Sequence, residues 1–105
     1  MADQAVIEKV KKYDEIICAR YPVKMVILYG SHGRGNYRED CDIDVAVVFE
    51  NLETDHYKTS ADLFKLRRAI DSRIEPVLLE SGNDVSGFLE SIIEYGTIIY
   101  PDRAA

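Results

Sequence analysis

The stretch Tyr29–Phe49 reads YGSHGRGNYREDCDIDVAVVF, and the fold expected for the rest of the chain depends on it. It opens with a glycine-rich turn after an apolar run and closes with an Asp-x-Asp pair that leads into a second apolar run. We therefore expect two neighbouring strands whose ends meet, with a polar loop between them that provides a cradle for phosphate opposite a metal site.

The second half of this stretch alternates acidic and apolar residues. A strand repeats every two residues, so Asp42 and Asp44 should share one face while Ile43, Val45 and Val47 share the other. Two adjacent carboxylates resist ionising together unless a cation sits between them, and oxygen ligands of this kind suit Mg²⁺. An isolated Asp-x-Asp pair is more often two solvated charges at a strand edge, so the upstream half decides the interpretation.

Gly30 and Ser31 directly follow the apolar run that ends at Tyr29. Glycine at a strand end allows positive φ and close backbone approach, so successive N–H groups can face an anion, with the Ser31 hydroxyl as an added donor. A flexible turn explains these glycines equally well, because the Lys-Ser/Thr ending of a P-loop is absent.

The two halves together form one motif, because ten residues separate Ser31 from Asp42-x-Asp44. Flanked by two apolar strands, this spacing resembles the nucleotidyltransferase domain of the DNA polymerase beta superfamily, specifically its minimal nucleotidyltransferases. The resemblance implies an α/β (α+β) polymerase-beta-like fold, with a small mixed β-sheet flanked by helices.

Length and charge limit the other possibilities. A chain of 105 residues is expected to form a single domain, residues 1–105. Its net charge of −6 makes nucleic acid an unlikely partner, because no general basic surface is available to neutralise a phosphate backbone. Apolar runs are too short to span a membrane and the first residues lack a basic start, so we expect a cytoplasmic protein. Cys18 and Cys41 match no metal-ligand spacing and are interpreted as reduced thiols.

Periodicity predicts an alternation of helices and strands, beginning with a helix. Helical stripes are expected over residues 3–20, 57–72 and 85–95, and strands over 23–29, 40–49, 73–80 and 97–100. Asp3 is the expected N-cap of the first helix and Gly96 the C-cap of the last, with Ser81 or Asn83 capping its start. Pro76 indicates either an edge position for the strand over 73–80 or a local irregularity in it.

The resemblance also indicates a third acid on the strand next to Asp42 and Asp44. Glu75 occupies that position in the sequence RIEPVL, although the superfamily more often has Asp there. Glu80 lies one strand length away as a rival, and an ordinary glutamate at a strand end is the simpler alternative.

By resemblance, the site residues take the following roles. Asp42 and Asp44 bind two Mg²⁺ ions, while Glu75 binds the catalytic ion and takes the proton of the acceptor hydroxyl. Gly30 and Ser31 hold the β- and γ-phosphates of ATP or another nucleoside triphosphate. Arg34, with His32 and Arg38 near it in the sequence, is available to bind the triphosphate.

No motif in the sequence specifies the acceptor. The resemblance implies a toxin–antitoxin pair, in which the protein is an antitoxin that places AMP on a tyrosine of an all-helical HEPN-domain partner, within a homo- or hetero-oligomer. The alternative is a catalytically weak binding module that neutralises its partner by masking it. Nucleotidylation of a small molecule ranks lowest, because such enzymes carry an added domain that binds the acceptor.

Overall fold

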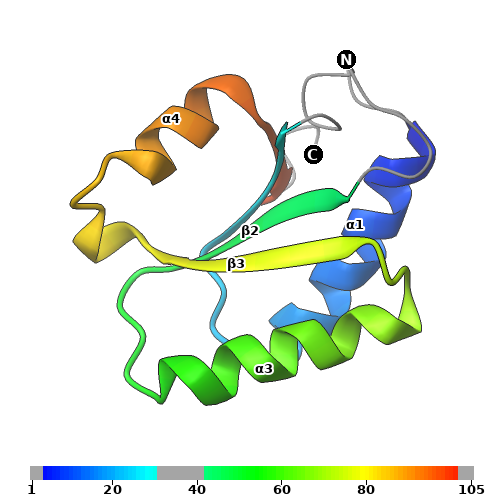
Figure 1. The fold of residues 1–105 in the computed structure, drawn as a ribbon, viewed down its shortest axis with the longest axis horizontal. Coiled ribbons are helices and arrows are strands. Elements are labelled where there is room, and N and C mark those ends of the chain that lie inside the picture. Colours follow the sequence, from blue (N-terminus) through cyan, green and yellow to red (C-terminus); the bar gives the residue numbers. More distant parts are fainter. Residues whose placement is uncertain (1–3, 31–41, 102–105) are drawn as a thin grey trace.

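The computed structural model describes residues 4–30 and 42–101, which form a sheet with helices on both faces (Figure 1). The elements in chain order are α1 (Gln4–Cys18), β1 (Met25–Tyr29), β2 (Ile43–Phe49), α3 (His56–Leu66), β3 (Ile74–Glu80), α4 (Phe88–Tyr95) and β4 (Thr97–Tyr100). Short 3₁₀ turns at Arg67–Ala69 and Ser81–Asn83 flank β3. The predicted alternation of helices and strands is confirmed, although several strands begin later than expected.

The strands form a four-stranded mixed sheet in the order β3-β2-β1-β4. β1 pairs antiparallel with both β2 and β4, whereas β2 and β3 run parallel. β3 is therefore an edge strand. This is one of the two possibilities that Pro76 indicated, because proline has no N–H to donate to a neighbouring strand. The predicted small mixed sheet flanked by helices is confirmed.

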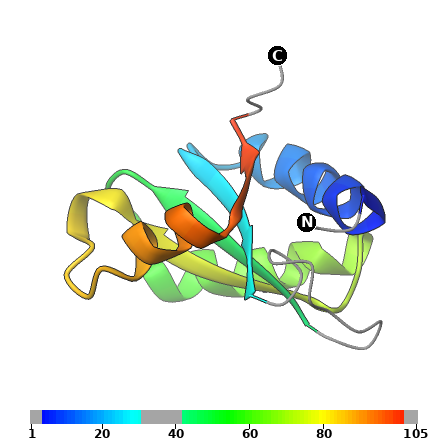
Figure 2. The same ribbon diagram turned by 90° about the horizontal axis from the view of Figure 1, so that it is seen from above.

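One face of the sheet is closed by α1 and α3 (Figure 2). The helical stripe predicted for α1 is the set that the structure buries: Val6, Val10, Tyr13 and Ile17. These side chains pack on the inward row of β2, which includes Ile43, Val45 and Val47. The Tyr13 hydroxyl donates to the Leu63 carbonyl of α3 at 2.6 Å, which joins the two helices inside the core.

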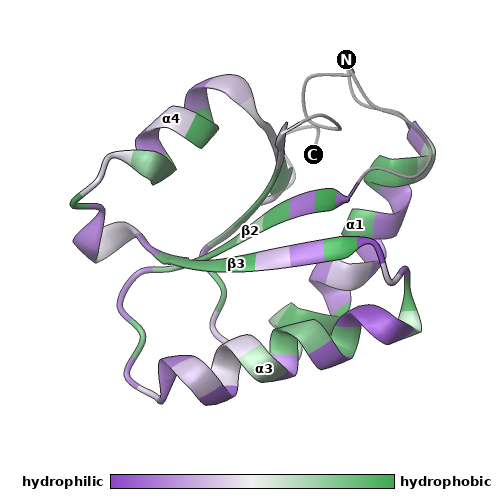
Figure 3. Cartoon of the chain, viewed as in Figure 1, coloured by the Kyte–Doolittle hydropathy of each residue, from purple (hydrophilic) through white to green (hydrophobic). Residues whose placement is uncertain are grey.

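Among residues 4–30 and 42–101, α4 is the helix that covers the opposite face. Leu89 and Ile92 of α4 pack on Ile27, Ala46 and Val48 of the sheet. Figure 3 shows hydrophobic residues along the strands that α4 covers, with hydrophilic segments nearer the strand ends. This second apolar cluster has fewer buried members than the first, and the half-buried side chains of Met25 and Tyr29 pack against it.

Two helix boundaries differ from the sequence prediction. The helix expected over 57–72 ends at Leu66, because the Arg67 carbonyl accepts from the N–H groups of Ile70 and Asp71 and tightens the last turn. The final helix begins at Phe88, so Val85 is not part of its buried stripe and is 91% exposed. The Asp84 carboxylate accepts from the N–H groups of Leu89 and Glu90, so neither Ser81 nor Asn83 caps this helix.

The remaining expectations for local structure have mixed outcomes. Gly96 is the C-cap of α4, as predicted, while Asp3 and Cys41 lie outside the described residues. Cys18 is half-buried at the end of α1, and its thiol donates to the Asp14 carboxylate at 2.9 Å. Within residues 4–30 and 42–101, no helix is long and apolar enough to cross a bilayer.

Candidate functional site

Three polar side chains are aligned in one row across the sheet, where β1 ends and β2 and β3 begin. Tyr29 at the end of β1 is paired with Asp44 on β2, and Asp44 is paired in turn with Glu75 on β3. All three belong to the strand faces that point away from α1 and α3, since Ile43 and Ile74 fill the closed core. The predicted neighbour relation between the Asp-x-Asp strand and the Glu75 strand is confirmed.

Gly30 lies against the Asp44 carboxylate in a way that only glycine permits. Its φ is +69°, and a Cβ atom at this position would lie 2.3 Å from Asp44 Oδ2. Both the backbone conformation and the space are thus closed to any larger residue. The Gly30 backbone and the Asp44 carboxylate therefore lie close together.

Tyr29 adjoins the candidate site and was not among the predicted site residues. Burial raises the pKa of its phenol, and the charges of Asp44 and Glu75 raise it further. The phenol thus lies within electrostatic range of both acids and stays protonated, available as a hydrogen-bond donor. The available signal was its position: Tyr29 is the last strand residue before Gly30, at the same sheet end as the acids.

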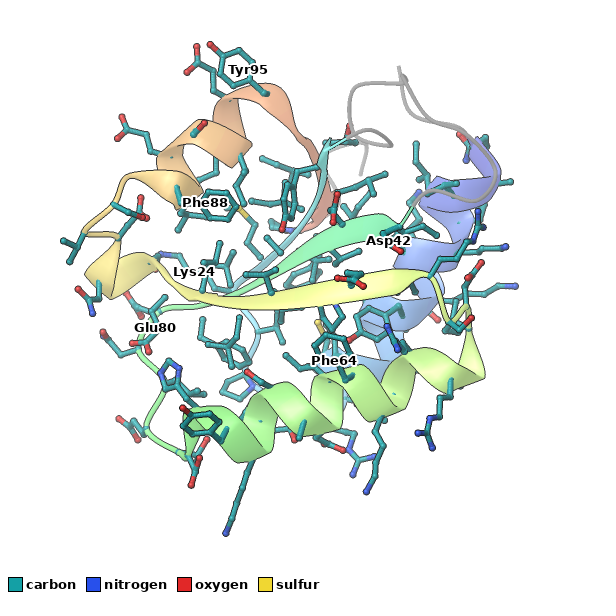
Figure 4. All side chains as sticks on the ribbon, in the orientation of Figure 1. Lys24, Asp42, Phe64, Glu80, Phe88 and Tyr95 are labelled. Atoms are coloured by element: carbon teal, nitrogen blue, oxygen red, sulfur yellow. The ribbon has the colours of Figure 1, made fainter. Side chains whose placement is uncertain are left out.

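The acids differ in how open they are to solvent. Asp44 is half-buried between its neighbours, whereas Asp42 and Glu75 are exposed. Figure 4 shows Asp42 at the end of β2, beside β3. Among the described residues, no three acidic, histidine or cysteine side chains already converge as a metal site. Because like charges repel, a bound cation would have to draw the carboxylates together.

The chemistry of this donor set nevertheless fits a hard divalent cation. Carboxylate oxygens on adjacent strands are ligands that Mg²⁺ accepts, and this ion keeps several positions for water or phosphate oxygens. The close approach of Gly30 to Asp44 puts the Gly30 backbone beside the carboxylate that would hold the ion, so a phosphate bound at Gly30 would adjoin that ion. The residues present are thus compatible with a site for a metal ion and a phosphorylated substrate.

Glu80 does not belong to this site. It is paired with Phe49 at the far end of β3, where its carboxylate contacts the His56 imidazole. Lys24, at the same far end, donates to the Ser81 hydroxyl at 3.1 Å (Figure 4). The rival third acid is therefore engaged in local contacts a full strand away from Asp44. The predicted phosphate ligands Ser31 and Arg34 lie outside the described residues, as do His32 and Arg38.

Comparison with known proteins assigns the chain to a family. The model of the nucleotidyltransferase domain family matches residues 10–99. Two relatives come from Methanocaldococcus jannaschii. "Putative protein adenylyltransferase MJ0141" is 28% identical over 95 residues, which cover 87% of this chain and 95% of that protein. "Putative protein adenylyltransferase MJ1379" is 40% identical over 43 residues, which cover 41% of this chain and only 43% of that protein.

A solved structure shows the same fold. The crystal structure of a "putative nucleotidyltransferase" from Sulfolobus solfataricus superposes with a TM-score of 0.65 at 19% identity. The match covers 90% of this chain and 78% of the crystallised one. Because the family model covers most of the chain, including both strands that carry Asp44 and Glu75, the protein belongs to the nucleotidyltransferase domain family.

Proposed function

We propose that this protein transfers AMP from ATP to a hydroxyl group of a protein acceptor. The observation that carries the proposal is the Gly30 turn pressed against Asp44, with Glu75 next in register on β3. Membership of the nucleotidyltransferase family supports the reaction type. The names of both archaeal relatives, which describe protein adenylyltransferases, support a protein as the acceptor.

Asp42, Asp44 and Glu75 would hold Mg²⁺ in this proposal. When bound, the ion would neutralise the charge of the phosphates and polarise the α-phosphate toward attack. Asp44 would be the central ligand, because it lies against Gly30 on one side and is paired with Glu75 on the other. The backbone of Gly30, together with Ser31 and Arg34, would bind the β- and γ-phosphates.

The position of Glu75 suits the acceptor side of the reaction. Its side chain is exposed on the edge strand, so a hydroxyl group can approach it from outside the sheet. The acceptor oxygen forms a bond to the α-phosphorus while the bond to the bridging oxygen of the β-phosphate breaks and pyrophosphate leaves. The hydroxyl proton passes to the Glu75 carboxylate, which acts as a general base.

For the acceptor, we propose a tyrosine of an all-helical HEPN-domain toxin, with this protein as its antitoxin. The resemblance noted in the sequence supports such a partner, and the net charge of −6 argues against a polynucleotide acceptor. A tyrosine side chain is also long enough to bring its hydroxyl to an exposed acid on an edge strand.

Two variants on the same strand test the reaction. The protein is purified with the partner that accompanies it and incubated with Mg²⁺ and ATP labelled on the α-phosphate. We expect labelled AMP on the partner, a rate lowered roughly a hundredfold or more by Glu75→Gln, and little change with Glu80→Gln. Equal rates for both variants would contradict the assignment of Glu75.

A measurement of how well each protein neutralises the partner, made beside the labelling experiment, separates catalysis from masking. If the wild-type protein transfers no label and Asp44→Asn still neutralises the partner, the protein acts as a binding module. If neutralisation requires both ATP and Asp44, the enzyme hypothesis stands. A partner whose mass increases by one AMP group identifies the acceptor directly.

A further inference from the structure

A cavity of about 160 Å³ adjoins the site between α4 and β1. Two of its lining residues also adjoin Asp44. Tyr29 is paired with Asp44 across the sheet, and Gly30 lies against its carboxylate. The other lining residues come from α4 and its end: Phe88, Ser91, Ile92, Tyr95 and Gly96. The cavity is thus continuous with the proposed phosphate site and is not a separate hollow elsewhere on the surface.

The walls of this cavity are suited to a flat aromatic ring. The Tyr29 and Phe88 rings meet edge to face with centroids 5.7 Å apart, which fixes the Phe88 ring beside the site. Phe88 is 39% exposed and Tyr95 is 60% exposed, and both residues line the cavity. Figure 4 shows Phe88 pointing from α4 toward the sheet and Tyr95 on the outer side of the helix. Ser91 adds a hydroxyl for the polar edge of a ring.

The size of the cavity excludes a whole nucleotide. Pockets for drug-sized ligands span about 300–1,000 Å³. A volume of about 160 Å³ is smaller than that range and suits a single ring system. Gly96 contributes to this shape, because a Cβ there would lie 2.8 Å from the Ile27 side chain, so the end of α4 can approach β1 closely.

The order of strands indicates which substrate the cavity serves. Glu75 lies on β3, on one side of Asp44, whereas Gly30 and the cavity lie on the β1 side. In an in-line transfer the acceptor enters opposite the departing pyrophosphate, which the Gly30 turn would hold. The acceptor therefore approaches from the Glu75 side, and the cavity on the opposite side remains for the nucleotide itself.

We propose that this cavity binds the base of the nucleoside triphosphate, with Phe88 as its main stacking surface. The proposal rests on the proposed function, since it places the base of the same substrate whose phosphates lie at Gly30 and Asp44. It adds α4 to the binding machinery. The short helix both covers the sheet and forms the wall against which the base packs.

The test compares binding of ATP with binding of inorganic tripolyphosphate, each with Mg²⁺, by isothermal titration calorimetry. Phe88→Ala should weaken ATP binding roughly tenfold and leave tripolyphosphate binding unchanged, because stacking on an aromatic ring is lost while the phosphate contacts remain. Phe64→Ala is the matched control, since Phe64 is also 39% exposed but lies on α3. It should affect neither ligand.

A second variant guards against a loss of folding in Phe88→Ala. Ser91→Met keeps Phe88 and fills the cavity from its exposed rim, so it should weaken ATP binding without weakening tripolyphosphate binding. If both variants bind ATP as tightly as the wild type, or weaken both ligands equally, the base-binding proposal is overturned. If the wild-type protein binds tripolyphosphate but gains nothing from the nucleoside of ATP, the cavity proposal fails and the phosphate site survives. A wild-type protein that binds neither ligand would overturn both proposals.

Discussion

The two faces of the sheet are built differently. On the face covered by α1 and α3, the core is continuous from Val6 to Leu63, and its largest side chains are fully buried. On the other face α4, with only eight residues, packs on Ile27, Ala46 and Val48, while Asp44 is half-buried and Glu75 is exposed. The closed face thus provides most of the apolar stabilisation, while the half-open face can place charged groups beside a substrate.

This difference explains why the acids are tolerated. Asp44 and Glu75 are adjacent like charges, which is an arrangement that costs stability. The apolar core on the opposite face of the sheet offsets this loss of stability. An acid on the face covered by α1 and α3 would be buried without a counter-ion, and this would cost much more stability.

The largest expected effect comes from comparing one isoleucine on each face. Ile17 of α1 is fully buried in the closed core, and Ile92 of α4 is 6% exposed in the smaller cluster. Replacing a buried isoleucine by alanine costs about 2–5 kcal/mol. We expect Ile17→Ala near the upper end and Ile92→Ala near the lower end, measured as the free energy of unfolding in urea. Equal losses would contradict the proposed difference between the faces.

A pair of glycines tests whether the open face is built for the site. Gly30 and Gly87 both have positive φ, at +69° and +75°, but no atom would lie near a Cβ added to Gly87. Alanine at either position should cost about 1–2 kcal/mol of stability through its left-handed backbone. Only Gly30→Ala should also abolish Mg²⁺-ATP binding, because its methyl group displaces the Asp44 carboxylate. Retained binding in Gly30→Ala would show that the contact with Asp44 is unimportant.

The free energy of unfolding should depend on acidic pH mainly through a carboxylate beside the closed face, Asp71. Arg73 hydrogen-bonds to the Asp71 carboxylate, and Lys9 of α1 donates to it at 2.8 Å; together they hold its pKa well below the usual range. A lowered pKa adds stability above the ordinary value near 4, and this stability is lost as the pH falls through the folded-state pKa.

Asp71→Asn should therefore lower the free energy of unfolding at pH 7 by about 1–2 kcal/mol and flatten its decline below about pH 4. The exposed Glu90, replaced by glutamine, serves as the control and should change little. Urea unfolding between pH 2 and pH 7, in a buffer series of about constant ionic strength, measures both effects. An unchanged acid profile for Asp71→Asn would contradict the role of this cluster.

The smallest effect concerns the thiol at the end of α1. Burial raises the pKa of Cys18 to about 12, and the hydrogen bond to Asp14 raises it as well. The thiol should stay protonated at neutral pH and react with iodoacetamide much more slowly than in the urea-unfolded chain. Because the folded pKa is raised, stability should decline as the pH rises above the unfolded value of about 8.5. Alkylation in a Cys41→Ser background measures the rate, and equal rates in folded and unfolded protein would contradict this environment.

Much of the fold was predictable because two periodicities are clear in the sequence. The alternation around Asp42 and Asp44 assigned both faces of β2 correctly, and the stripe from Val6 to Ile17 identified the buried side of α1. Helix ends were less predictable, because they depend on hydrogen bonds such as those of Asp84, which spacing alone does not reveal.

The candidate site was only partly predictable for the same physical reason. The motif identified Asp42 and Asp44, but the pairing of Asp44 with Glu75 depends on strand register, and the contact with Gly30 depends on three-dimensional approach. The involvement of Tyr29 and the Phe88 cavity follows from the placement of α4 over β1. The sequence places Tyr29 at a strand end beside Gly30, but no local pattern places Phe88 next to it.

The most direct test of this account is Mg²⁺-ATP binding by Asp44→Asn, measured by calorimetry together with thermal denaturation. We expect affinity to fall by about tenfold or more, because a central carboxylate ligand is lost. We expect the melting temperature to stay the same or rise, because repulsion from Glu75 is relieved. Unchanged ATP affinity in a folded Asp44→Asn protein would contradict the claim that the open face of the sheet is the substrate site.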